Sequence, residues 1–303
     1  MKAVDALLTG LVDYAGLFPP ASQDMRSALE SYASYRESAD RSALGRFIVP
    51  VGRLAELEEG GRDLLPRGAD SEPWRLSVLV GEDVSSAGAQ MLKFNCNHWS
   101  GSEDGHAVID VAELKASTTE EIQRQRGGLP RFFTAYFEIP ISGDVSSLLK
   151  GIAEAGARAK VRTGGVTVDA FPRSGKLLDF IVGCRRERVP FKATAGLHHP
   201  IRGSYRLTYE PNSPAGTMYG FLNVFLAAAL VWAGDDEATA LALLEERDAS
   251  ALAFSDDAIT WRGRRITADE LRAARDGFAI SFGSCSFREP VDDLARLASA
   301  HAR

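Results

Sequence analysis

The chain is poor in cysteine, with only Cys96, Cys184 and Cys285 among its 303 residues and no CxxC spacing. An odd number of widely separated cysteines favours neither a disulfide framework nor a thiolate zinc site. We therefore expect a cytoplasmic protein, because thiols stay reduced in that compartment. Cys285 is expected to be a buried, inert side chain.

An excess of positive charge is also missing, since the formal net charge is −6. Phosphate backbones and anionic lipids attract basic surfaces, so we expect neither a nucleic-acid partner nor a membrane partner. The most apolar run, from Met218 to Ala233, contains Asn223 and is short for a membrane span. This run therefore predicts a buried helix.

The chain does contain short β-rich runs that alternate with helical patterns over most of its length. The expected strands are residues 16–18, 46–51, 75–80, 107–112, 132–139, 158–163, 191–195 and 279–283. Expected helices between them include residues 24–38, 144–155, 174–187 and 290–301. Eight strands with intervening helices predict an α/β fold in which residues 1–303 form a single TIM (β/α)8 barrel.

Residues 203–277 interrupt this alternation before the last strand. A Pro- and Gly-rich loop at 209–216 leads into two expected helices, at 217–232 and 235–247, and then into a hairpin around Arg262 and Gly263. An insertion of this length is expected either to cap the mouth of the barrel or to form a contact in a homo-oligomer.

Several expected strands carry polar residues on one face. Residues 158–163 present Arg158, Lys160 and Arg162, residues 191–195 present Lys192 and Thr194, and residues 132–139 present Glu138 with Thr134 and Tyr136. The outer face of a barrel strand packs on apolar helices, so these polar faces are expected to point inward. Unpaired buried charges are costly, which leaves either a structural ion-pair network or a reactive site.

Two lysines on adjacent strands suggest Schiff-base chemistry. A free lysine has a pKa of about 10.4, so its amine is almost always protonated near neutral pH and cannot attack a carbonyl group. A neighbouring cation and partial desolvation both lower such a pKa. We therefore expect Lys192 to lower the pKa of Lys160 and so make Lys160 nucleophilic.

The segments AKVRTGG (159–165), FKATAGLHHPIR (191–202) and FGSCSFREPVDDL (282–294) resemble the last three barrel strands of the deoxyribose-phosphate aldolases. These are class I aldolases of the TIM-barrel fold. Weaker similarities lie at VDYAGLFPPAS (12–22), AVIDVAEL (107–114) and AYFEI (135–139). The resemblance touches all eight strands and is specific in the three C-terminal motifs.

The resemblance implies a role for individual residues. Lys160 matches the imine-forming lysine of the family, and Lys192 matches the lysine that perturbs it. Asp110 matches the acidic residue of proton transfer, Gly196 and Ser286 match parts of a phosphate-binding loop, and Gly283 matches its turn glycine.

The chain also departs from the family's pattern. Ala195 replaces a glycine of the phosphate-binding loop, Cys285 replaces a serine, and a His-His-Pro segment follows Leu197. We therefore expect a small carbonyl substrate other than the phosphorylated deoxysugar of the family.

Further residues around the expected mouth could bind the substrate. Backbone N–H groups near Ser284 and Ser286 precede a helix and could bind an anion, although a plain helix cap explains them equally well. Arg162 could bind a carboxylate, and His198 or His199 could hydrogen-bond the substrate or transfer protons. Glu138, Thr194, Gly196 and Gly283 complete the expected substrate-binding set.

The resulting hypothesis is a carbon–carbon lyase that uses Lys160, Lys192 and Asp110 and needs neither a metal nor an organic cofactor. The first alternative is a metal-dependent lyase, isomerase or hydrolase with a divalent ion on His198, His199 and Glu138. The second alternative is a non-catalytic, ligand-binding barrel in which the lysines are locked in ion pairs.

Overall fold

The protein forms a closed TIM barrel, seen in a computed structural model that describes residues 1–302. Eight parallel strands follow one another around the barrel in the order β1, β2, β3, β4, β5, β6, β7 and β13, and β13 closes on β1. Their bounds are Val12–Tyr14 (β1), Leu44–Pro50 (β2), Trp74–Leu79 (β3), Ala107–Lys115 (β4), Thr134–Glu138 (β5), Arg158–Arg162 (β6), Phe191–Thr194 (β7) and Ala279–Ser284 (β13). The predicted fold class is confirmed.

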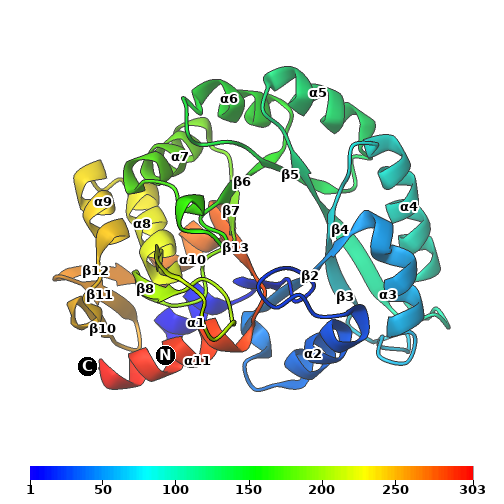
Figure 1. Cartoon of the computed structure of the whole chain (residues 1–303), viewed down its shortest axis with the longest axis horizontal. Coiled ribbons are helices and arrows are strands. Elements are labelled where there is room, and N and C mark those ends of the chain that lie inside the picture. Colours follow the sequence, from blue (N-terminus) through cyan, green and yellow to red (C-terminus); the bar gives the residue numbers. More distant parts are fainter. Residues whose placement is uncertain (303) are drawn as a thin grey trace.

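Helices surround the strands as an outer ring (Figure 1). They are α2 (Met25–Glu37), α3 (Leu54–Gly61), α4 (Val84–Asn97), α5 (Thr119–Gly128), α6 (Ser146–Glu154), α7 (Ser174–Glu187) and α11 (Arg288–Ala300), with α1 (Lys2–Leu8) before the first strand. Their starts follow from local chemistry: Asp24 accepts a hydrogen bond from the Ser27 N–H at the start of α2, and Thr118 and Glu121 form a capping box on α5.

The first strand was predicted at the wrong place. It covers Val12–Tyr14, which pair with residues 282–284, whereas the predicted residues 16–18 lie in the loop that leaves the barrel. The reason is that Asp13 lies inside the barrel and is almost completely buried. A carboxylate in the middle of a three-residue strand hides the apolar pattern on which the prediction depended.

Strand β4 is longer than the predicted 107–112 and contains an irregularity. Against β3, Ile109 pairs with Leu76 and Val111 pairs with Ser77, so Asp110 is an extra residue in the ladder. An extra residue shifts the alternation of side chains along a strand. Beyond it, Val111 and Glu113 share the inward face with Ser77.

Residues 203–277 contain a two-stranded hairpin and an outer layer. The hairpin consists of β8 (Gly203–Arg206) and β9 (Ala215–Met218). The rest comprises α8 (Phe221–Ala233), α9 (Glu237–Glu245), a three-stranded sheet of β10 (Leu252–Phe254), β11 (Ala258–Trp261) and β12 (Arg264–Thr267), and α10 (Ala268–Gly277). Both predicted helices and the hairpin around Arg262 and Gly263 are present, but the first helix begins at Phe221 and not at residue 217, because residues 217 and 218 belong to β9.

Most of this insertion lies beside the barrel and does not cover its mouth. Helix α8 follows α7 in the outer ring, α9 packs on the outside of these two helices, and the small sheet lies near the chain termini (Figure 1). Phe221 and Phe225 of α8 contact Phe282 of β13, which explains why the α8 segment is so apolar. Within residues 1–302, no helix is long and apolar enough to cross a membrane.

Candidate active site

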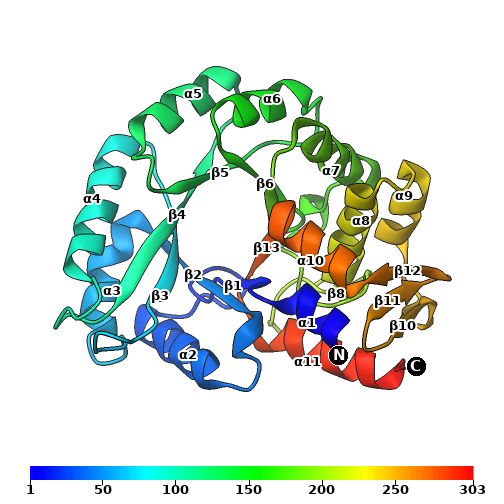
Figure 2. The same cartoon turned by 180° about the vertical axis from the view of Figure 1, so that it is seen from behind.

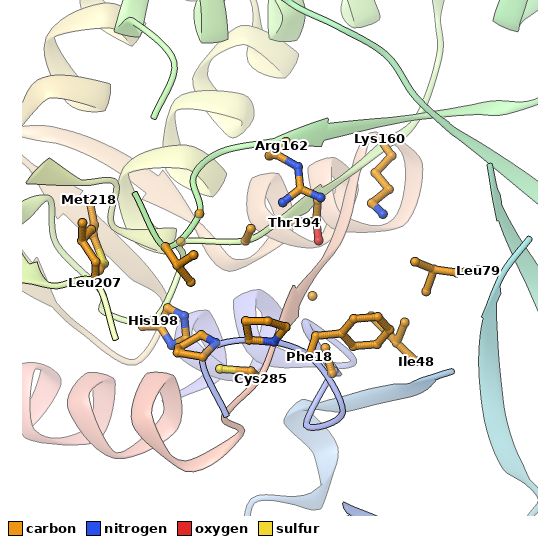
Figure 3. A pocket seen from close by; sticks show the side chains of 18 of the residues that line it. Phe18, Ile48, Leu79, Lys160, Arg162, Thr194, His198, Leu207, Met218 and Cys285 are labelled. Atoms are coloured by element: carbon orange, nitrogen blue, oxygen red, sulfur yellow. The ribbon is translucent and has the colours of Figure 1, made fainter. Parts of the chain in front are cut away.

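A cavity of about 290 Å³ opens at the carboxyl ends of the barrel strands. Lys160, Arg162, Thr194 and His198 contribute polar side chains to it (Figure 3). The carboxylate of Glu113 also lines it. Its apolar wall comes from four places: the loop after β1, the strands β2 and β3, the loops after β6 and β7, and the β8–β9 hairpin. These residues are Ala15, Phe18, Pro19, Pro20, Ile48, Leu79, Val166, Ala195, Leu207 and Met218. The hairpin is therefore the part of the insertion that covers the mouth.

Lys160 reaches this cavity from the middle of β6, although its side chain is only 6 % exposed. Its Nζ lies 2.8 Å from Glu113 Oε2 and 2.8 Å from Glu138 Oε2. Glu138 Oε2 is buried and accepts no hydrogen bond, so its contact with Lys160 is an ion pair without hydrogen-bond geometry. The amine of Lys160 is thus paired with carboxylates and still borders open space.

Lys192 on β7 lies deeper and is fully enclosed. Its Nζ donates hydrogen bonds to Asp13 Oδ2 and to Glu113 Oε1, both at 2.6 Å, and it lies over the ring of Tyr136. Burial by itself would lower the pKa of Lys192, but Asp13 and Glu113 outweigh burial and raise the pKa above its ordinary value. Lys192 is therefore a permanently charged residue of the interior.

Glu113 connects the two lysines. One carboxylate oxygen accepts from Lys192 and from Ser77 Oγ, both at 2.6 Å, while the other faces Lys160. Burial favours the protonated acid, but the two lysines together lower the pKa of Glu113 well below its usual range. Sequence reasoning missed Glu113, because the extra residue in β4 moves the inward face away from Asp110.

The expectation that the two amines repel each other directly needs correction. The lysines lie on adjacent strands, and Lys160 pairs with Lys192 in the sheet register, as predicted. However, the Glu113 carboxylate binds both nitrogens, and the pKa of Lys192 is raised. The main interaction at this pair is therefore the attraction of both lysines to Glu113, and not the repulsion between their two charges.

Asp110 does not lie at this site, contrary to the prediction. It accepts hydrogen bonds from Arg46 at 2.7 and 2.8 Å and from Arg75, two arginines near the amino ends of β2 and β3. Burial would raise the pKa of Asp110, but the two guanidinium groups outweigh burial and lower it. Asp110 is therefore a structural partner of arginines at the opposite end of the barrel.

Several predicted substrate-binding residues do lie together at the cavity. Arg162, whose side chain is half exposed, borders the cavity and donates from Nε to Glu138 Oε1 at 3.2 Å. Thr194, Gly196 and Gly283 also line the cavity. Gly196 has φ of +76°, and a Cβ there would lie 3.0 Å from the Gly164 backbone, so glycine is required at this position.

Ser284 and Ser286 do not line the cavity but organise the turn before α11. Ser284 Oγ accepts from the Ser286 N–H at 3.3 Å, and Ser286 Oγ accepts from the Glu289 N–H at 3.2 Å. Ser286 thus satisfies one N–H of the first turn of α11 from the position before the N-cap residue Phe287, which itself makes no side-chain cap. Cys285 between them borders the cavity, and burial raises the pKa of its thiol.

The two histidines line one hollow beside the main cavity but contact different carboxylates. His198 borders the cavity and contacts Glu289 Oε2 through Nδ1 at 2.9 Å. His199 contacts Asp293 through Nδ1 at 2.7 Å and stacks on Tyr205. Glu138 is engaged by Lys160 and Arg162, and within residues 1–302 no three His, Cys, Asp or Glu side chains are grouped to hold a metal ion.

No family model and no curated protein sequence matches this chain. The resemblance to the class I aldolases therefore depends on the motifs named above, and any function has to be argued from the cavity and its side chains.

Proposed function

We propose that the protein is a class I lyase that cleaves or forms a carbon–carbon bond in a small carbonyl compound through an imine on Lys160. The observation that carries this proposal is the position of Lys160: its amine is buried between two carboxylates and borders a cavity at the carboxyl ends of the strands. Barrel enzymes keep their chemistry at this end.

In this proposal Glu138 receives the proton that Lys160 must lose. Its Oε2 atom is 2.8 Å from Lys160 Nζ and has no other donor bound to it, so its lone pairs face the Lys160 amine. The neutral amine then adds to the substrate carbonyl, and the proton returned by Glu138 helps the carbonyl oxygen to leave as water. The protonated imine then accepts the electron pair of the breaking carbon–carbon bond and becomes an enamine. Glu138, ionised again, takes the proton of the hydroxyl group on the departing carbon, so that this fragment leaves as an aldehyde or ketone. Protonation of the enamine and hydrolysis of the imine release the second product and restore Lys160.

Lys192 and Glu113 have supporting roles in this scheme. Lys160, Lys192 and Arg162 balance the charges of Asp13, Glu113 and Glu138, so the cluster is neutral when all six groups are ionised. Moving a proton from Lys160 to Glu138 keeps that balance, whereas losing it to solvent does not. The charged Lys192 holds Glu113 in place beside the reacting amine.

The cavity walls indicate the kind of substrate. Phe18, Ile48, Leu79, Leu207 and Met218 present an apolar surface, and Arg162 lines the same cavity beside Lys160. We propose a small, largely apolar aldehyde or ketone, with Arg162 available to a carboxylate or other oxygen-rich group.

Borohydride trapping tests this proposal. The full chain is incubated with a panel of small aldehydes and ketones, reduced with borohydride, digested, and mapped by mass spectrometry. We expect a stable mass increment on the peptide that contains Lys160, and its loss in Lys160→Met. Lys93→Met, which removes an exposed lysine of α4 in the outer ring, is the matched control and should keep the increment.

A non-catalytic, ligand-binding barrel is the second candidate, and the ion pairs of Lys160 are the observation that favours it. If no carbonyl compound leaves an increment on Lys160, or if Lys192 and surface lysines are labelled equally, the lyase proposal fails and this candidate replaces it.

A further inference from the structure

A second cavity, of about 350 Å³, lies at the amino-terminal end of the barrel. Thr9 and Gly10 before β1 line it, as do side chains at the beginnings of β2, β3 and β6 and residues of α10. Figure 2 shows this side of the molecule, with α1 and α10 in front of the strands. The lysine cavity opens at the other ends of the same strands, so the two are separate.

The wall of this second cavity, called the arginine cavity below, is strongly cationic. It contains five arginines and a single acidic residue, namely Arg46, Arg75, Arg158, Arg272, Arg275 and Asp276. A cluster of this kind is unexpected in a chain whose net charge is −6. The interior of a barrel is usually filled by branched apolar side chains, so charged residues are not needed there for packing.

The neighbouring carboxylates do not neutralise this cluster. Arg46 and Arg75 share Asp110, and Arg272 contacts the exposed Asp269. With Asp276, three carboxylates thus face five guanidinium groups, which leaves two positive charges. Asp13 also attracts Arg46 and Arg275, but its charge is balanced by Lys192.

The other two arginines bind neutral groups. Arg158 donates to the Tyr136 hydroxyl at 3.0 Å, and Arg275 donates to the carbonyl oxygens of Leu7, Thr9 and Ala279 at 2.8 to 2.9 Å. Burial lowers the pKa of Arg275 to about 10, so it remains charged near neutral pH. Its charge therefore adds to the field of the cavity.

An adjoining hollow extends the positive surface. It shares Gly10, Arg46 and Arg75 with the arginine cavity and adds Arg36 and Arg41, opposed by Glu72. Arg36 donates hydrogen bonds to the backbone carbonyl oxygens of Glu72 and Pro73. The excess of positive charge therefore extends over both hollows.

We propose that the arginine cavity binds a small phosphate-bearing anion. Guanidinium groups present several N–H donors in a planar fork that matches phosphate oxygens. Here they come from β2, β3, β6 and α10, and therefore from several directions. A phosphate group has acceptor oxygens on all sides, whereas a carboxylate has two in one plane, which favours phosphate. This site is independent of the proposed lyase chemistry.

Calorimetric titration of the full chain at low ionic strength, with pyrophosphate as the probe, tests the proposal. We expect saturable binding at one site, and a loss of affinity of about tenfold or more in Arg75→Gln/Arg272→Gln. Both side chains are more than half exposed, so the variant is expected to fold, and a thermal melt checks this. The single variant Arg272→Gln, which leaves Asp110 untouched, should show a smaller loss.

Lys93→Gln/Lys150→Gln removes the same charge from exposed positions on α4 and α6 and should keep the affinity. The proposal is overturned if pyrophosphate shows no saturable binding, or if both arginine variants bind it as tightly as the unchanged protein does. It is also overturned if the lysine variant loses as much affinity for pyrophosphate as the double arginine variant. Binding of malonate as tight as that of pyrophosphate would overturn the choice of phosphate. None of these outcomes bears on imine formation at Lys160.

Discussion

At the scale of single residues, the charge balance around Lys192 is the feature that most constrains this protein. Its nitrogen, fully enclosed, is bound by Asp13 and Glu113 at 2.6 Å each. Removing one partner from a buried ion pair leaves an uncompensated charge, which costs far more than the pair contributes. Stability and the proposed chemistry therefore depend on the same residues.

Replacement of Lys192 by methionine is expected to lower the free energy of unfolding by about 3–5 kcal/mol, because Asp13 and Glu113 lose their shared cation. Urea denaturation of the full chain measures this change. The double variant Lys192→Met/Asp13→Asn removes one charge of each sign and should be less destabilised than the sum of the two single variants. Strictly additive effects would contradict the role assigned to this pair.

Individual residues also show how far sequence reasoning extends. Lys160 and Lys192 were expected to point inward on adjacent strands, because polar residues of a barrel strand avoid its outer face, and this is confirmed. Glu113 and Asp13 were missed. For Glu113 the signal was present, since a glutamate follows an apolar run at 111–112, but the ladder irregularity at Asp110 is set by pairing with β3.

At the scale of elements, Asn223 explains how the insertion is attached to the barrel. Its Oδ1 atom accepts from the Arg202 N–H at 2.8 Å, and its Nδ2 atom donates to the carbonyl oxygens of Leu243 and Glu246. One buried amide in α8 thus joins the loop after β7 to the end of α9. The sequence shows Asn223 as an interruption of an apolar run, and its partners come from segments about 20 residues away on either side.

Asn223→Ala should lower the free energy of unfolding by about 3 kcal/mol, since it leaves buried backbone groups without partners. The exposed Asn212, in the loop between β8 and β9, provides the matched control, and Asn212→Ala should stay within about 0.5 kcal/mol of the unchanged protein. Equal thermal and urea stability of the two variants would show that Asn223 is not a structural joint.

At the scale of the whole molecule, carboxylates with lowered pKa values make stability depend on pH. Glu113 and Glu138 are buried beside lysines that lower their pKa values. In the insertion, burial would raise the pKa of Glu246, but hydrogen bonds from Arg262, from the Asp248 backbone and from Trp261 lower it from 4.5 to about 2. Such groups stabilise the fold while they are ionised.

The sign of this dependence follows from the direction of the shifts. A folded-state pKa below the unfolded value contributes stability that is complete above the unfolded pKa and is lost as the pH falls through the folded pKa. For Glu246 the window runs from 4.5 down to about 2. We therefore expect the free energy of unfolding to decline as the pH falls below 4.5, measured by urea denaturation at a series of pH values.

Glu246→Gln is the matched variant for this measurement. It lies away from the lysine cavity, and it should be less stable than the unchanged protein at neutral pH by about 1–3 kcal/mol. The difference in the free energy of unfolding between the variant and the unchanged protein should narrow as the pH falls from 4.5 to about 2. A constant difference at every pH would contradict the lowered pKa.

The sequence by itself determined the barrel, the order of its elements and the inward face of its last strands. These depend on periodicity, on helix caps and on the cost of placing charge against apolar helices, all of which are local properties. Only the tertiary structure decided which carboxylates meet the lysines, that Asp110 belongs to the arginine end, and which part of the insertion covers the mouth. These outcomes depend on strand register and barrel closure, which join residues far apart in the chain, such as Asp13 and Lys192.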